Sequence, residues 1–186
     1  MPFYDISHSY AFTPAQREAL AERITTLHCT MFNTPSMFVN IRFAPIKDEE
    51  YWYGRKRKPN TNRIFGHVRS GSNRSAEAFA KLAEEIEAIW DDVVGKTESD
   101  VGPGNPKTLQ TVFIVPGITT REESLAIPLV SSPCTHRNET SNAIQAGTEK
   151  AWLRDNLESF KERAGRGDQD FKDLLAELEA RPELMT

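Results

Sequence analysis

Two similar segments in the first two-thirds of the chain limit its fold more than any other feature. Each contains a short apolar stretch, a longer stretch with apolar residues at helical spacing, and a second short apolar stretch. The expected strands lie at residues 3–7, 37–43, 63–68 and 109–115, and the expected helices at 14–31 and 75–94. This pattern predicts two consecutive β-α-β units.

The two expected helices match without a gap when the first is shifted by 62 positions. Each begins at a residue that can cap a helix, Thr13 in the first and Ser75 in the second, and Pro14 suits the first helical turn. The matching apolar pairs are Leu20 with Leu82, Ala21 with Ala83, Ile24 with Ile86, and Leu27 with Ile89. Helical periodicity alone produces some of these matches, so the pattern indicates equivalent buried faces rather than proving a duplication.

Two such units favour an α/β (α+β) fold with one four-stranded sheet. Right-handed crossovers put both helices on the same face of that sheet. The other face is then left without a covering layer. An uncovered apolar sheet face is a physical reason to expect an oligomer.

The chain is expected to divide near residue 130, into a body at 1–130 and a helical extension at 131–186. Within the extension, apolar residues recur at helical spacing at 148–163 and 168–181. We expect these helices to pack on the body, and a partner-binding surface is the alternative.

Residues 45–62, between the two units, are expected to form a loop or an irregular hairpin around Tyr51–Tyr53. The tract Arg-Lys-Arg-Lys at 55–58 lies within this segment. It resembles a nuclear-localisation tract, but a solvated loop that steers anionic substrates is the favoured interpretation.

The composition excludes several functional classes. A formal net charge of −4 over 186 residues argues against a general nucleic-acid binder. Two cysteines, Cys29 and Cys134, provide no disulfide framework and indicate a reducing compartment. No apolar run approaches the ~18 residues of a membrane span, and the first residues lack the pattern of a signal peptide. We expect a cytoplasmic protein.

Pro2 is the first candidate for chemistry. Initiator methionine is commonly removed before a small residue, which would leave a free secondary amine at the start of a strand. An α-amino group titrates near pH ~8, and burial disfavours its charged form, so such an amine can act as a base near neutral pH. Met-Pro by itself is a common start and carries little information.

His28 and two arginines are the other candidates. His28 lies in the last turn of the first expected helix, where a partly buried structural histidine is the commoner interpretation. Arg69 and Arg74 flank the turn between a strand and the second helix, where guanidinium groups and helix N–H groups together can bind an anion. A solvated turn is the alternative. No pair of histidines has metal-ligand spacing, so no metal site is predicted.

These features together resemble the tautomerase superfamily, and most of all its cis-3-chloroacrylic acid dehalogenase-like branch. The resemblance is carried by Met1-Pro2 before a strand, by the helix from Thr13-Pro14 to His28, by the strand Met37–Phe43 and by the arginine-bearing turn at 69–75. It covers about residues 2–130. It implies a 4-oxalocrotonate tautomerase-type β-α-β fold, a homotrimer and a site that needs no cofactor.

The resemblance also implies residue roles. Pro2 corresponds to the amino-terminal general base or acid, and His28 to the histidine that helps to hold the substrate carboxylate. Arg69 and Arg74 correspond to the arginine pair that binds and polarises that carboxylate, with a separation two residues longer than in the family. Glu122 corresponds to the glutamate that activates water, and Glu123 is the near alternative.

Thr111 departs from the family pattern, because the dehalogenase has a water-activating tyrosine at the corresponding position. This difference argues against faithful dehalogenase chemistry. The expected activity is therefore a tautomerase or hydratase reaction on a small unsaturated or 2-oxo carboxylate. A malonate-semialdehyde-type decarboxylase is one alternative. A non-catalytic binding protein is the other, and a retained Met1 would favour it.

Overall fold

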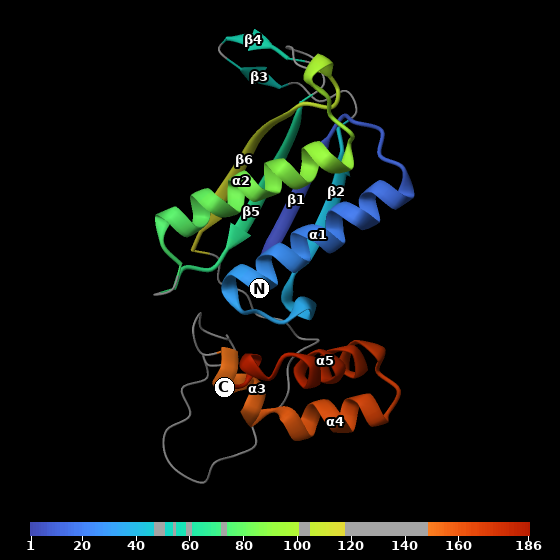
Figure 1. Ribbon diagram of the computed structural model, residues 1–186, viewed down its shortest axis with the longest axis vertical. Coiled ribbons are helices and arrows are strands. Elements are labelled where there is room, and N and C mark those ends of the chain that lie inside the picture. Colours follow the sequence, from blue (N-terminus) through green and yellow to red (C-terminus); the bar gives the residue numbers. More distant parts are fainter. Residues whose placement is uncertain (47–50, 54, 59–60, 72–73, 101–104, 118–148) are drawn as a thin grey trace.

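The computed structural model describes the chain except for residues 47–50, 54, 59–60, 72–73, 101–104 and 118–148 (Figure 1). The strands are β1 (Phe3–His8), β2 (Asn40–Pro45), β3 (Trp52–Tyr53), β4 (Lys56–Arg57), β5 (Asn62–Val68) and β6 (Leu109–Pro116). The α-helices are α1 (Pro14–Phe32), α2 (Ala76–Val93), α3 (Glu149–Asp155), α4 (Leu157–Gly165) and α5 (Gln169–Ala180). Short 3-10 helices are η1 (Ser36–Phe38), η2 (Glu98–Asp100) and η3 (Pro182–Leu184).

The central sheet confirms the predicted fold class. Its strand order is β2-β1-β5-β6, with parallel outer pairs and an antiparallel contact between β1 and β5 in the middle. Helices α1 and α2 lie side by side across one face (Figure 1). Each β-α-β unit therefore supplies half of one sheet and one covering helix.

Capping residues fix where both helices begin. The Thr13 hydroxyl accepts the Gln16 N–H at 3.2 Å, and the Gln16 side chain accepts the Thr13 N–H at 3.0 Å, which completes a capping box before Pro14. The Ser75 hydroxyl accepts the Ala78 N–H in the same way at 3.2 Å. These bonds satisfy N–H groups that the helix itself leaves without partners.

The main core lies between the helix pair and the sheet. Leu20 and Ile24 of α1 are fully buried, as are Leu82 and Ile86 of α2, so the matched positions do face the same sheet. Trp90 is also fully buried, and its indole N–H donates to the Lys107 carbonyl at 2.8 Å. Burying the ring together with a satisfied N–H keeps the polar cost of this large side chain low.

The predicted strand at 37–43 is wrong at its start. Residues 36–38 form η1, and β2 begins only at Asn40. Alternating apolar residues are compatible with a strand, but Ser36 is held in a turn by the distant Glu177 side chain. A tertiary contact therefore overrides the local pattern.

The predicted helix at 148–163 is also corrected, because it is divided into α3 and α4 at Asn156. The Asn156 side chain is buried and donates to the Trp152 carbonyl at 2.7 Å. A side chain that bonds to backbone in this way competes with regular helix geometry. The other helix of the extension, predicted at 168–181, agrees closely with α5.

Helices α3, α4 and α5 enclose a second apolar cluster, which includes Leu153, Phe160, Phe171, Leu174 and Leu178. They lie at the end of the sheet where α1 ends, and α5 contacts η1 (Figure 1). The predicted division near residue 130 lies outside the described residues. In the described part of the chain, no helix is both long and apolar enough to cross a membrane.

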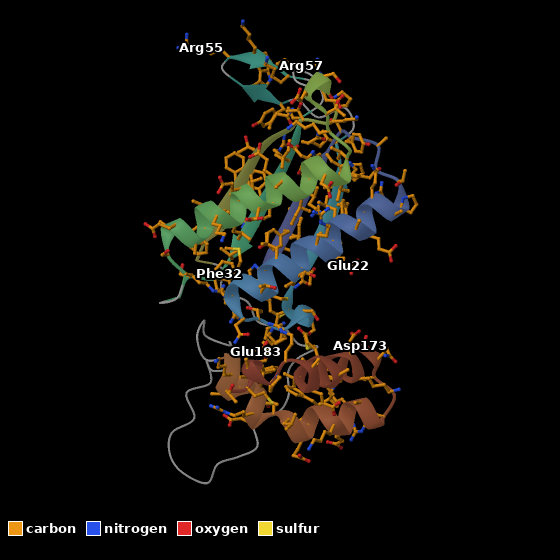
Figure 2. The ribbon with its side chains drawn as sticks, in the orientation of Figure 1. Glu22, Phe32, Arg55, Arg57, Asp173 and Glu183 are labelled. Atoms are coloured by element: carbon orange, nitrogen blue, oxygen red, sulfur yellow. The ribbon has the colours of Figure 1, made fainter. Side chains whose placement is uncertain are left out.

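The segment at 45–62 contains the expected hairpin, formed by β3 and β4. Figure 2 shows Arg55 and Arg57 on this hairpin, which projects at the end of the body opposite to the C-terminal helices. Arg55 and Arg57 are exposed, as is Trp52. The role of this hairpin in steering anionic substrates stays a prediction.

Asn62 connects three separate backbone segments at the start of β5. Its fully buried side chain accepts the Ser9 and Tyr10 N–H groups at 2.8 and 3.1 Å. It also donates to the Pro106 and Thr108 carbonyls, at 2.7 and 2.9 Å. No apolar side chain could satisfy these four groups.

We predict that Asn62→Ala lowers the free energy of unfolding by about 2–4 kcal/mol, because it leaves buried N–H and C=O groups unpaired. Chemical denaturation measures this loss. Gln169→Ala is the matched control, since it removes an exposed amide in α5 that bonds to the Asp173 side chain, and it should cost less than about 0.5 kcal/mol. Equal losses in the two variants would contradict the assigned role of Asn62.

Candidate functional site

The N-terminus lies at the end of the sheet where α1 ends. Met1 is 6% exposed and Pro2 is buried, although both precede the first strand. The Asn40 N–H donates to the Pro2 carbonyl at 3.1 Å, so the first residue of β2 holds Pro2 in register with the sheet. The reactive atom proposed from the sequence, the Pro2 nitrogen, carries Met1 in this structure.

His28 lies beside this N-terminus, in the last turn of α1, and is fully buried. Its Nδ1 and the Tyr4 hydroxyl are 2.7 Å apart and hydrogen-bonded. The two rings meet edge to face, with centroids 5.8 Å apart. The other ring nitrogen, Nε2, is buried and has no hydrogen-bond partner among the described residues.

Gly66 makes room for Tyr4. It pairs with Tyr4 in the β1–β5 register, and a Cβ at this position would lie 2.9 Å from Tyr4 Cε1 and from Ile114 Cδ1. Real Cβ atoms do not approach other atoms so closely. The tyrosine ring that contacts His28 therefore lies flat against β5 only because residue 66 has no side chain.

Burial keeps His28 neutral. Burial, the positive charge of Arg74 and that of the chain's amino group together lower the pKa of His28 to about 3, and burial is the largest of these causes. Burial also raises the pKa of Tyr4, so its hydroxyl stays protonated. The pKa of the neighbouring Cys29 thiol is raised to about 11, mainly by burial, so this thiol is not a nucleophile near neutral pH.

Arg74 joins the same site from the start of α2. Its guanidinium carbon lies 4.8 Å from the centroid of the Phe32 ring, and that ring lies 4.8 Å from the His28 ring. Arg74 is 8% exposed, and its Nη1 donates to the Arg69 carbonyl at 3.3 Å. A cation next to an aromatic face and the start of a helix forms a setting that suits an anion.

Several predicted site residues thus come together. Pro2, His28 and Arg74 share one end of the body, and Arg69 joins them through its backbone and is itself buried. Glu122 and Glu123 lie outside the described residues. No group of three or more His, Cys, Asp or Glu residues in the described part of the chain is arranged to hold a metal ion.

Thr111 does not join this group within one chain. On β6, Thr111 pairs with Arg63 of β5, whereas Pro116 at the other end of β6 pairs with Val68, next to Arg69. Thr111 instead lines a separate open cavity of about 390 Å³ between α2 and β6, together with Glu84 and Glu87. The departure from the family pattern at this residue therefore leaves the contacts of His28 and Arg74 unaffected.

Three residues that contact the candidate site were not predicted from the sequence, namely Tyr4, Phe32 and Asn40. Phe32 follows His28 by one helical turn, and that spacing could have placed both rings on one face. Tyr4 alternates with Phe3 on the first strand and was identifiable as inward-facing, but its contact with His28 depends on how α1 crosses β1. Asn40 acts through its backbone N–H, for which a side chain gives no signal.

Comparisons with known proteins agree with this architecture. The family model described as "Putative oxalocrotonate tautomerase enzyme" matches residues 1–126. No curated protein matches the chain.

Solved structures show the fold. N1, a member of the cis-3-chloroacrylic acid dehalogenase family, is 19% identical, with a TM-score of 0.57 over 92% of this chain and 99% of its own. A native fused 4-OT is 13% identical over 62% of this chain and 84% of its own, with a TM-score of 0.46. The macrophage migration inhibitory factor of Toxoplasma gondii is 17% identical over 62% and 87%, with a TM-score of 0.41.

The similarity to N1 supports the whole fold, and the two weaker ones add nothing to the argument. The family match covers about two-thirds of the chain and includes the N-terminus, His28 and both arginines. The chain therefore belongs to the tautomerase family described as putative oxalocrotonate tautomerase enzymes, and it is an isomerase-type enzyme.

Proposed function

We propose that the chain, once Met1 is removed, uses the Pro2 amine as acid and base in a tautomerase or hydratase reaction on a small unsaturated or 2-oxo carboxylate. One observation carries this proposal. The N-terminus, the neutral His28 and the Arg74 cation meet at a single buried end of the sheet. A base, a hydrogen-bond donor and a cation are the groups that proton transfer next to a carboxylate requires.

The surroundings of Pro2 favour its neutral form. Pro2 is buried, and the terminal charge and Arg74 both act on His28 next to it. Desolvation and a nearby cation each disfavour a protonated amine, so we expect the pKa of the Pro2 amine to lie below the ~8 of an exposed chain terminus. A free amine can then take a proton from the carbon next to a carbonyl and return it to the other end of the enolate.

Arg69 and Arg74 would bind the substrate carboxylate. Guanidinium groups bind carboxylates in a forked geometry, and a cation fixed beside the reacting carbon stabilises the negative charge of an enolate as it forms. Glu122 would orient water in a hydratase reaction, with Glu123 as the alternative. This chemistry requires no cofactor.

His28 would act as a neutral hydrogen-bond donor. If the Tyr4 hydroxyl donates to Nδ1, its proton is satisfied and Nε2 carries the ring N–H. In the opposite arrangement, both the tyrosine proton and the bare Nε2 would be buried without partners among the described residues. The first arrangement costs less, because each unpaired buried polar group costs about 1–3 kcal/mol. It supplies an N–H group for a carboxylate or an enolate oxygen.

We also propose a homotrimer that works in the cytoplasm. The sheet face opposite to the helices exposes Phe113 and Val115 at 39% and 41%, and the Phe65 ring stacks on Phe113 at 4.7 Å. Burial of these rings against other copies would remove apolar surface from water. The free thiol of Cys29 suits a reducing compartment. Sedimentation equilibrium tests the assembly, and a monomer at micromolar concentration would contradict it.

Substitutions at Pro2 and Arg74 should affect different kinetic constants. We predict that Pro2→Ala lowers kcat about 10²–10³-fold, because it alters the reacting amine. Arg74→Ala should mainly raise KM, since it weakens carboxylate binding while Arg69 still stabilises the enolate charge, so its loss of kcat should be the smaller of the two. Steady-state kinetics with phenylpyruvate, acetylenecarboxylate and malonate semialdehyde measure both effects and separate tautomerase, hydratase and decarboxylase activity.

Lys161→Ala is the control for these variants, because Lys161 forms an exposed ion pair with Glu158 in α4, away from the proposed site. It should leave both constants unchanged. Unchanged kinetics in Pro2→Ala would reject the proposed base, and inactivity of the parent on all three substrates would favour a binding protein.

The His28 ring should remain neutral far below the usual pKa of histidine. We predict that ¹⁵N NMR detects one neutral tautomer, protonated on Nε2, from pH 8 down to about pH 4. Because the folded-state pKa is about 3 and the unfolded value is ~6.5, the unfolded state binds more protons between these values. The part of the folding stability that depends on a neutral His28 is therefore complete above about pH 6.5 and is lost as the pH falls toward 3.

Tyr4→Phe should allow both tautomers, because it removes the only group bonded to Nδ1 in the described structure. Tyr10→Phe is its matched control, since it deletes a phenolic hydroxyl that bonds to Gln16 instead. A His28 titration near pH 6.5 in the parent protein, or a ring protonated on Nδ1, would contradict the proposed donor role.

A further inference from the structure

The segment between α1 and β2 connects two parts of the proposed site. At one end, the last turn of α1 carries His28. At the other end, the Asn40 N–H holds the Pro2 carbonyl at 3.1 Å. Residues 33–38 therefore link the helix end that carries His28 to the strand that holds Pro2. The C-terminal helices contact this connecting segment (Figure 2).

Arg181, the residue that follows α5, binds the end of α1. Its Nη2 donates to the Cys29 carbonyl at 3.3 Å and to the Asn33 side-chain oxygen at 3.4 Å, and its Nη1 donates to the Thr34 carbonyl at 3.4 Å. Helix α1 has no basic residue in its own last turn. A cation at a helix C-terminus stabilises the carbonyl groups there, so Arg181 supplies from the extension what α1 lacks.

Glu177 fixes the next part of the segment, one helical turn before Arg181. Its carboxylate accepts the Ser36 N–H at 3.0 Å and the Ser36 hydroxyl at 2.6 Å. The same carboxylate accepts from Arg181 Nη1 at 2.8 Å. The Glu177 side chain is 16% exposed and the Arg181 side chain 26%. Because both are largely buried, solvent screens this pair less than it screens surface pairs.

Apolar contacts complete the attachment. Phe38 is 1% exposed, and its ring centroid lies 5.7 Å from that of Trp152 in α3. Met37 packs against the apolar cluster of the extension. Figure 2 labels Glu183, whose carbonyl accepts from the Asn33 side chain at 3.1 Å, in the same region. Polar and apolar contacts thus hold both sides of the segment.

We propose that the C-terminal helices are a positioning element of the active site, in which Arg181 and Glu177 act as positioning residues by fixing residues 33–38. The catalytic consequence rests on the proposed function of Pro2 and His28. An error of about 1 Å in the placement of a reacting group can cost up to about 10²-fold in rate. A segment that holds His28 at one end and Pro2 at the other therefore affects turnover without touching the substrate.

Three variants remove the contact from both sides. Glu177→Gln keeps the shape of the side chain, Arg181→Met removes the guanidinium, and Ser36→Ala removes the hydroxyl from the body while leaving the extension intact. Arg166→Met is the matched control, because Arg166 lies in the same extension and its guanidinium pairs with the exposed Glu162. All four are made in the full-length chain.

Hydrogen exchange and NMR report on the segment without any substrate. We expect the Val39 and Asn40 amides to exchange at least tenfold faster in Arg181→Met, and the Ile64 amide of the central sheet to be unchanged. The ¹⁵N signals of the His28 ring should shift in the same variant. With substrate, kcat should fall about tenfold while KM changes less than twofold.

A purely stabilising role for the extension predicts a different result. Thermal stability would fall while the His28 signals, the Val39 and Asn40 amides and kcat stay at their parent values, and that outcome overturns the proposal. If Arg181→Met does not fold, Glu177→Gln and Ser36→Ala decide the question, and their double variant should be no worse than the stronger single one. If the parent is inactive on every carboxylate, the proposed function fails, while exchange rates and ring signals still decide the positioning role.

Discussion

The buried hydrogen bond between Tyr4 and His28 is the contact on which the arrangement of the site depends. It joins β1, which begins directly after Pro2, to the last turn of α1 at 2.7 Å. Both residues are fully buried, so neither can exchange this partner for water without opening the core. The bond therefore fixes the end of the helix against the strand and, through the tautomer it favours, decides which ring nitrogen carries the proton.

The other features of this end of the molecule act on the same pair. Gly66 leaves room for the tyrosine ring, Phe32 contacts both the His28 ring and the Arg74 guanidinium, and the Arg74 charge helps to keep His28 neutral. A neutral donor beside a permanent cation can bind an anion without a proton uptake step of its own. The C-terminal helices add contacts from outside, at the segment that follows α1. The site is thus supported by groups from both ends of the chain.

Most of the fold could be predicted from the sequence because the strong signals are local. Thr13 and Gln16 form a capping box, and Leu20, Ile24, Leu82 and Ile86 mark the buried faces by spacing alone. The late start of β2 and the break at Asn156 could not be predicted, because both depend on side-chain bonds to backbone. In the first case, that bond comes from a residue more than 140 positions away.

The candidate site was predictable only in part for the same reason. His28, Arg69 and Arg74 could be found through their position at element ends and the family resemblance, whereas Tyr4 and Arg181 act through contacts that no local pattern encodes. Thr111 shows the limit of a family alignment, since the pattern matches it to a site residue while the register of β6 places it at the other end of the sheet within one chain. Whether such a residue belongs to the site depends on the distances between elements, which the residue type alone does not give.

The proposed mechanism requires above all that the Pro2 amine is free and largely neutral near pH 7. The most direct measurement is an NMR titration of protein labelled with ¹⁵N-proline, after intact mass spectrometry of the chain from its native host. If the mechanism is right, the mass lacks Met1 and the Pro2 nitrogen titrates below the ~8 of an exposed α-amino group. A mass that includes Met1, or a Pro2 nitrogen that stays protonated above pH 8, would contradict it.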